Sequence, residues 1–168
     1  FRPFVFTTAV NLNLTGWVKN TSSGVEIEIN GEPAALDAFL EKVKSNPPPL
    51  ARIDQIYAAP VPVNGYERFQ ILSSETVEGE FVPISPDMSI CPDCRRELFD
   101  PTNRRYRYPF INCTNCGPRF SIIRDIPYDR PKTTMSAFDM CPDCRSEYEN
   151  PLDRRFHAQP IACSDCGP

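Results

Sequence analysis

Eight cysteines carry the clearest chemical signal in this sequence of 168 residues. All lie after position 90, in four C-x-x-C pairs: Cys91 and Cys94, Cys113 and Cys116, Cys141 and Cys144, Cys163 and Cys166. Paired knuckles of this kind are typical of metal ligands, whereas a disulfide scaffold would scatter its cysteines. Four thiolates close a tetrahedral zinc site and leave no position for water. We therefore predict two structural zinc ions (Zn2+), with redox-active dithiols or iron–sulfur ligation as the alternatives.

The cysteine pairs belong to an internal repeat. A shift of 50 residues superimposes Cys91 on Cys141 and Cys116 on Cys166, and both copies read C-x2-C-x18-C-x2-C. Such similar copies suggest that each repeat closes its own zinc site, but a nested pairing of the first knuckle with the fourth would use the same ligands. Each repeat has little apolar surface, so we expect zinc binding to supply much of its folding free energy.

Two further features accompany the cysteines. The arginine pairs Arg104–Arg105 and Arg154–Arg155 recur at the same place in each repeat. Because a zinc ion with four thiolates carries a formal charge of about -2, we hypothesise that the arginines offset this charge or dock the repeats on a neighbour; the alternative is that they are solvated surface residues. His157, the one histidine, is interpreted as a loop or packing residue or as a contact to another domain.

Composition narrows the class of protein. There is no run of about 18 apolar residues, so the sequence predicts no transmembrane helix. Thiolate–zinc sites suit a reducing compartment, and we expect a cytoplasmic protein. The net charge is -4, and only residues 91–131 are basic, with 8 basic and 5 acidic side chains. This balance argues against a nucleic-acid-binding protein.

Before the cysteines, residues 1–74 alternate between helical and strand patterns. The stretches "FRPFVFTTAVNLNL" and "EPAALDAFLEKVKS" have helical periodicity, while "GWVKNT", "GVEIEIN", "ARIDQIYAAPV" and "YERFQILSS" are typical of strands. A strand ahead of the first helix would complete a βαββαβ unit. We therefore predict an α+β fold, a ferredoxin-like sandwich that lacks its first strand.

The rest of the chain divides into short parts. Residues 75–90 are acidic, contain proline and have no periodicity, which predicts a linker. Residues 91–118 and 141–168 are expected to be the two four-cysteine zinc-finger modules, and residues 119–140 their connector.

Arg2 and Asn20 could together form a catalytic site in the first part. Arg2 begins a helix, where free backbone N–H groups and the helix dipole favour anions. Asn20 ends the following strand. An arginine that binds a phosphate and an asparagine that holds a water would suit hydrolysis of an acyl phosphate.

Four stretches of the sequence extend this interpretation. "FRPFV" followed by "LTGWVKNTSSGVEIEINGE" resembles the acylphosphatase family, while "RYRYPFINCTNCGPRF" and "DRRFHAQP" resemble the HypF family of hydrogenase-maturation carbamoyltransferases. The resemblance implies that Arg2 is a phosphate ligand, that Asn20 positions the water, and that the eight cysteines bind zinc. It also implies carbamoyl phosphate as substrate, ATP as the cofactor of later domains, and a HypE-like partner protein that accepts carbamoyl on its C-terminal cysteine.

Several parts of the family pattern are not found in this sequence. The G-x-V-Q-G-V-G phosphate loop and the first strand expected before Phe1 are not in this sequence, nor are the ATP-binding and transfer domains. We therefore expect weak or no hydrolysis by the fragment alone. The alternative hypothesis is a non-catalytic zinc-finger module that binds protein or RNA.

Overall fold

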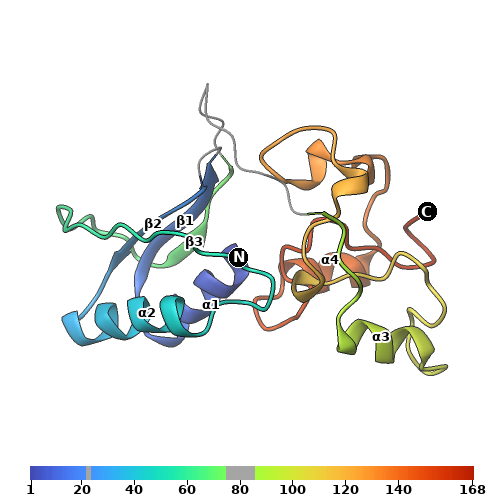
Figure 1. Ribbon diagram of the computed structural model, residues 1–168, viewed down its shortest axis with the longest axis horizontal. Helices are drawn as coiled ribbons and strands as arrows, with labels where there is room; N and C mark the ends of the chain where they lie inside the picture. Colours follow the sequence, from blue (N-terminus) through green and yellow to red (C-terminus); the bar gives the residue numbers. More distant parts are fainter. Residues whose placement is uncertain (22–23, 75–85) are drawn as a thin grey trace. The chain divides into compact units, whose positions relative to one another are not determined.

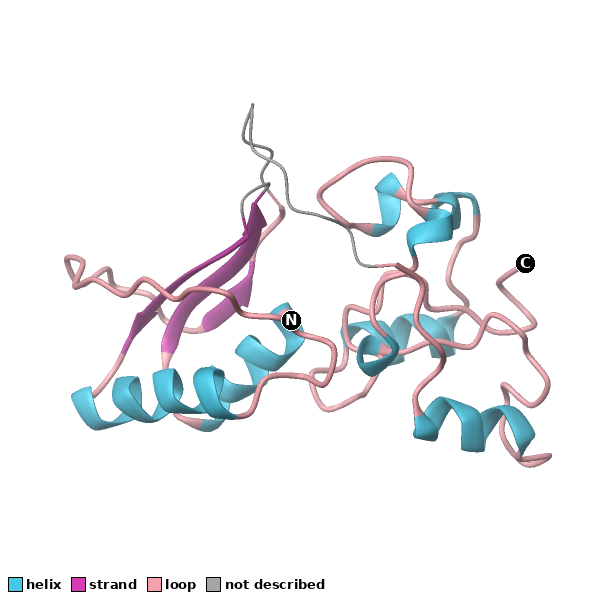
Figure 2. Cartoon of the chain, in the orientation of Figure 1, coloured by secondary structure: helices cyan, strands magenta, loops and turns pink. Residues whose placement is uncertain are grey.

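The computed structural model describes residues 1–21, 24–74 and 86–168, and the chain divides into two compact units, Phe1–Glu80 and Phe81–Pro168 (Figure 1). In the described residues, the strands of a sheet occur only in the first unit, whereas the second consists of short helices and loops (Figure 2). No helix in the described ranges is long and apolar enough to span a membrane.

The first unit is an α+β layer structure, as predicted. Its elements, in chain order, are α1 (Arg2–Asn11), β1 (Thr15–Thr21), β2 (Gly24–Asn30), α2 (Pro33–Ser45) and β3 (Phe69–Ile71). The sheet order is β2-β1-β3, with β1 antiparallel to β2 and parallel to β3. Both helices cover one face of this sheet (Figure 1). Proline occupies the first turn of each helix, where its missing N–H costs no hydrogen bond.

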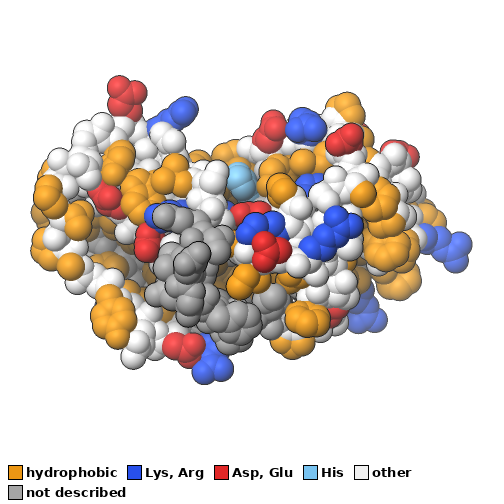
Figure 3. All heavy atoms as spheres, turned by 90° about the horizontal axis from the view of Figure 1, so that it is seen from above, with side chains coloured by type: hydrophobic (Ala, Val, Ile, Leu, Met, Phe, Trp, Pro, Cys, Tyr) orange, Lys and Arg blue, Asp and Glu red, His pale blue; other side chains and the backbone are white. Residues whose placement is uncertain are grey.

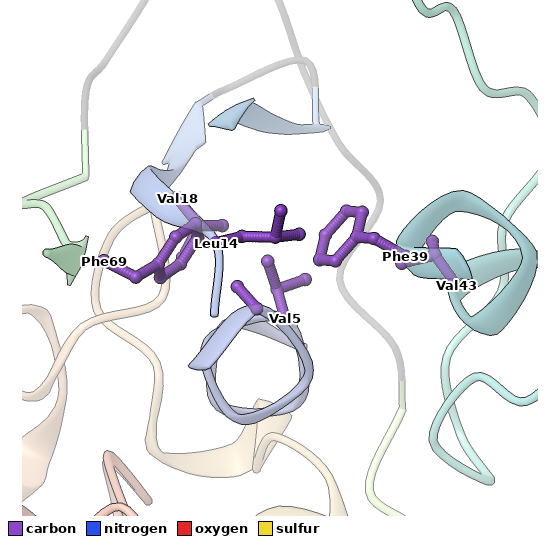
Figure 4. Packing of buried hydrophobic residues seen from close by; sticks show 7 residues of the cluster. Val5, Leu14, Val18, Phe39, Val43 and Phe69 are labelled. Atoms are coloured by element: carbon purple, nitrogen blue, oxygen red, sulfur yellow. The ribbon is translucent and has the colours of Figure 1, made fainter. Parts of the chain in front are cut away.

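An apolar core joins the helices to the sheet (Figure 4). Its buried members are Val5, Ala9, Leu14, Val18, Phe39, Val43 and Phe69. Gly16 is required where β1 meets β2: its φ is 131°, and a Cβ there would lie 2.0 Å from the carbonyl oxygen of Glu28. The core therefore fixes which face of β1 turns toward the helices.

One strand prediction was wrong and another was too long. Residues 51–61, "ARIDQIYAAPV", form no strand, and of "YERFQILSS" only Phe69–Ile71 pairs with the sheet. A strand is stable only when a neighbouring strand completes its hydrogen-bond ladder. In the described chain, residues 51–61 have no such neighbour, and most of them are exposed. The predicted hairpin loop includes residues 22–23, which lie outside the described ranges.

The second unit contains both cysteine repeats. Its helices are α3 (Pro92–Phe99), α4 (Pro142–Glu149) and the short 3₁₀ helices η1 (Thr114–Cys116), η2 (Phe120–Ile122), η3 (Arg130–Lys132) and η4 (Thr134–Ala137). The connector is packed into this unit, because the buried Arg130 donates hydrogen bonds to the carbonyl oxygens of Gln159 and Ile161 at 2.9 and 2.8 Å. Of the predicted linker, residues 75–85 lie outside the described ranges and residues 86–90 are irregular.

Basic and acidic side chains are interspersed on the face shown in Figure 3. The described atoms of this face therefore give no support to the nucleic-acid-binding alternative, which would need basic side chains gathered together.

Candidate metal centres and anion site

The eight cysteine sulfurs gather into two clusters, each from one repeat. The first cluster consists of Cys91, Cys94, Cys113 and Cys116, and the second of Cys141, Cys144, Cys163 and Cys166. Within each cluster all four sulfurs lie within 4.8 Å of one another. The structure thus brings together the knuckles of one repeat, as the similarity of the copies suggested, and not the nested pairs.

The sulfur spacing fits a zinc ion. The Sγ–Sγ distances between Cys113 and its neighbours Cys91 and Cys116 are 3.6 and 3.8 Å, and those between Cys163 and its neighbours Cys141 and Cys166 are both 3.8 Å. A regular tetrahedron with Zn–S bonds of about 2.3 Å has edges of about 3.8 Å. The same distances are far too long for a disulfide, whose S–S bond is about 2.05 Å. All eight cysteines are accordingly free thiols that could each donate one sulfur ligand.

Local backbone structure positions the first knuckle of each repeat in the same way. Cys91 and Cys141 are the N-caps of α3 and α4, and the Sγ of each accepts a backbone N–H three residues later at 3.5 Å. Proline follows each cap in the first helical turn. Gly117 ends the second knuckle of the first repeat with a φ of 77°, a conformation that favours glycine. The starts of α3 and α4 therefore fix the positions of the first two sulfurs of each repeat.

The arginine pairs reach across from one repeat to the other. Arg104 Nη2 lies 3.0 Å from the Sγ of Cys144, and Arg154 Nη1 lies 3.0 Å from the Sγ of Cys94. Both cysteines are fully buried and occupy equivalent positions in their repeats. Each cluster is therefore contacted by a guanidinium of the repeat that does not supply its ligands.

The second arginine of each pair is buried between the repeats. Arg105 and Arg155 expose only 2% and 5% of their surface, which excludes the solvated-surface alternative. Arg105 Nε donates to the carbonyl oxygen of Ala162 at 2.9 Å, and Arg155 Nε donates to that of Asn112 at 3.1 Å. These bonds also cross between repeats, so the arginines dock one repeat on the other, as one branch of the hypothesis stated.

Two glutamates complete the arrangement. Glu147 accepts hydrogen bonds from Arg104 and Arg105, and Glu97 accepts them from Arg154 and Arg155. Burial disfavours the ionised Glu147, but the hydrogen bonds from the two arginines outweigh it and lower its pKa to about 2. The pKa of Glu97 is lowered by the same balance of causes. Sequence reasoning missed both residues, although the 50-residue shift that matches the cysteines also superimposes Glu97 on Glu147.

Tyr108 of the first repeat also approaches the second cluster. It is 4% exposed, and a Cβ on Gly167 would lie 2.1 Å from its hydroxyl oxygen. Burial, followed by the nearby Cys166, Cys163 and Cys144 thiolates, raises the pKa of Tyr108 to about 12. His157, by contrast, stacks on Tyr148 at a ring-centroid distance of 5.0 Å and meets Phe156 edge-on, which agrees with a packing role.

The candidate anion site lies in the first unit. Arg2 is buried in the first turn of α1, and its Nη1 donates to the Ser74 hydroxyl at 3.0 Å. Ser74 follows β3, which runs parallel to β1, so this bond holds the guanidinium near the end of the sheet where β1 finishes. Asn20 stands at that end of β1.

Strand periodicity places Asn20 on the same face as Arg2. Side chains two residues apart in a strand share a face. Val18 packs in the core that α1 covers, so Asn20 belongs to the face covered by α1, whereas Lys19 belongs to the other. Arg2, at the start of α1, and Asn20, at the end of β1, therefore lie toward the same end of the sheet.

Comparisons with known proteins agree with both halves of this description. The family described as acylphosphatase matches residues 1–71, and the family described as HypF finger matches residues 90–123 and 140–168. An acylphosphatase of Pediococcus pentosaceus is 41% identical over 64 residues, which are 36% of this chain and 71% of that protein.

Longer relatives match nearly the whole chain. Carbamoyltransferase HypF2 of Cupriavidus necator is 49% identical over 142 residues, which cover 82% of this chain and 17% of that protein. A crystal structure of full-length HypF in the phosphate- and nucleotide-bound form superimposes with a TM-score of 0.95 at 60% identity, covering 99% of this chain and 22% of that one. The chain thus spans about a fifth of the length of these HypF relatives.

Proposed function

This chain belongs to the acylphosphatase family and corresponds to the N-terminal region of HypF carbamoyltransferases, and on that premise we propose that it is the acyl-phosphate-hydrolysing part of such an enzyme, with carbamoyl phosphate as its substrate. The observation that carries the proposal is that the buried Arg2 and the strand-end Asn20 lie toward the same end of the sheet and share one face.

Arg2 would bind the phosphate group of the substrate. Its guanidinium presents several N–H donors in one plane, a geometry that matches phosphate oxygens. The start of α1 adds the positive end of the helix dipole. The hydrogen bond to Ser74 restricts the side chain, so less rotational freedom is lost when an anion binds.

Asn20 would position the attacking water. An amide both accepts and donates hydrogen bonds, so it can orient a water molecule without itself changing protonation. Held near the bound phosphate, that water attacks the acyl phosphate and releases carbamate and phosphate. This division of roles uses orientation and charge stabilisation and no covalent intermediate on the protein.

We assign the remaining parts of the proposed reaction to segments that HypF relatives carry in addition to the region matched here. We propose that an upstream phosphate loop completes the anion site and that the expected first strand supplies residues 51–61 with a ladder partner. Downstream domains would use ATP to activate carbamate as an adenylate and pass the carbamoyl group to the C-terminal cysteine of a HypE-like hydrogenase-maturation protein. The two zinc fingers, with one Zn2+ each, would join the hydrolytic unit to those domains in the cytoplasm.

The test is to extend the chain upstream by the strand and phosphate loop of a HypF relative and to measure phosphate release from carbamoyl phosphate. Arg2→Ala or Asn20→Ala in the extended protein should lower kcat by about 100- to 1,000-fold, the usual effect of removing one charge-stabilising donor. Arg52→Ala is the matched control, because the Arg52 side chain is 87% exposed and pairs only locally with Asp54. Activity that is indifferent to Arg2 would leave the non-catalytic docking module as the better account.

A further inference from the structure

The contacts between the two fingers follow a crossed pattern. Here the first finger means residues 91–118 and the second finger residues 141–168. Arg104 and Arg105 of the first finger place their Nη2 atoms 3.0 and 3.3 Å from the Sγ of Cys144 in the second. Arg154 and Arg155 of the second finger lie 3.0 and 4.0 Å from the Sγ of Cys94 in the first.

The ion pairs of two glutamates also connect one finger to the other. Glu147, in the second finger, bonds both arginines of the first, and Glu97, in the first finger, bonds both arginines of the second. Each of these glutamates lies three residues after the cysteine that the same arginines contact, one turn along the same helix. One arginine pair thus contacts both a sulfur and a carboxylate of the opposite finger.

The crossed contacts change the net charge around each zinc site. A zinc ion with four thiolates has a formal charge of about -2, and the neighbouring glutamate adds another negative charge. The two arginines of the opposite finger reduce the formal charge of each site from about -3 to about -1. Cys94, Cys144 and Arg105 are buried, where uncompensated charge is costly because little water screens it.

We propose that the two zinc sites are coupled in trans: the arginine pair of each finger retains the zinc ion of the other. The second unit therefore holds its two ions as an interdependent pair. When one finger loses its metal and its fold, its arginines no longer offset the charge of the opposite cluster, so the second ion is released more easily. A finger separated from its neighbour binds zinc more weakly than it does within the unit.

The experiment follows which cysteines lose protection first. The zinc-loaded chain is incubated with excess EDTA and N-ethylmaleimide, and alkylation of each cysteine is followed by mass spectrometry of its peptides. Arg154→Gln should speed the alkylation of the first cluster by about 10- to 100-fold, the usual cost of losing a group that hydrogen-bonds a metal ligand. Arg104→Gln should speed that of the second cluster by a similar factor. In both variants the affected cysteines lie in the finger that was not mutated.

Arg96→Gln and Arg145→Gln are the matched controls. Their side chains are 70% and 54% exposed and pair with carboxylates of their own helix, so neither variant should change the order of alkylation. Arg154→Lys and Arg104→Lys keep the charge but lose the planar fork of donors, and they should give smaller effects of the same crossed pattern. Faster alkylation of the mutated finger than of the opposite finger, or rates matching the controls, would each overturn the proposal.

Discussion

The two units of this chain bury different kinds of side chain. The first unit is held by an aliphatic and aromatic core that contains no cysteine. In the second unit, cysteine is the commonest buried apolar residue, and three arginines, Arg105, Arg130 and Arg155, are buried as well. Hydrophobic burial can stabilise the first unit without a ligand, whereas the thiolates and arginines of the second require a metal ion as their counterpart.

Because their buried side chains differ, the two units specify their structures in different ways. In the first unit, the periodicity of the apolar residues determines which face of each helix and strand is buried. Packing of Val18 and Phe39 between the sheet and the helices then fixes how these elements lie against one another. In the second, most residues lie in turns, and the positions of the chain segments are set by four-sulfur clusters and by the arginine pairs that join them. Removing one kind of interaction at a time should therefore affect one unit and spare the other.

Zinc removal should produce the largest effect. Structural zinc sites contribute about 10 to 16 kcal/mol each in small peptides, so dialysis against a strong chelator should unfold the second unit. Hydrogen-exchange mass spectrometry should show loss of protection throughout residues 86–168. Trp17, the one tryptophan, lies in β1 and reports on the first unit, and its fluorescence should stay unchanged. A shared loss of protection in both units would contradict the comparison.

Truncation of the apolar core should come next in size. Phe39→Ala removes a side chain that is 2% exposed, and such changes cost about 3 to 5 kcal/mol. The free energy of unfolding of the first unit, followed by Trp17 fluorescence in urea, should fall by this amount while the zinc content stays at its original value. Val63→Ala, at a position 85% exposed, is the control and should leave both quantities unchanged.

Loss of one carboxylate should have the smallest effect, and it should separate the units. Glu147→Gln removes the negative charge and one of the two oxygens that accept hydrogen bonds from two arginines, and we expect the free energy of unfolding of the second unit to fall by about 1.5 to 3 kcal/mol at pH 7. Because folding lowers the pKa of Glu147 to about 2, its contribution is present above its ordinary pKa of about 4.3 and is lost as the pH falls toward 2.

The matched control for that variant lies in the first unit. Glu26→Gln removes an ion pair with Lys19 across β1 and β2, at an N–O distance of 3.2 Å and with the glutamate 55% exposed. Exposed pairs of this kind contribute under about 1 kcal/mol. Calorimetric unfolding of both variants gives the comparison, and equal losses in the two units would show that the charges of the second unit are no more important than those of the first.

Much of the fold could be predicted from the sequence because it depends on local patterns. Helical periodicity predicted α1 and α2, and strand-like stretches predicted β1 and β2. The C-x-x-C spacing identified all eight candidate ligands, because two sulfurs three residues apart can reach one ion. Residues 51–61 were predicted incorrectly because a strand also needs a partner, which periodicity alone does not supply.

Local sequence patterns were thus sufficient to identify the eight candidate sulfur ligands, the repeat and the α+β character of the first unit. Three other features depend on the tertiary fold: the pairing of knuckles within each repeat, the placement of Arg2 and Asn20 toward the same end of the sheet, and the crossing of the arginine pairs. Arg104 and Cys144 are 40 residues apart, and no local pattern relates them. Their contact exists because the two fingers pack against each other, and packing between segments distant in sequence is decided by the whole fold.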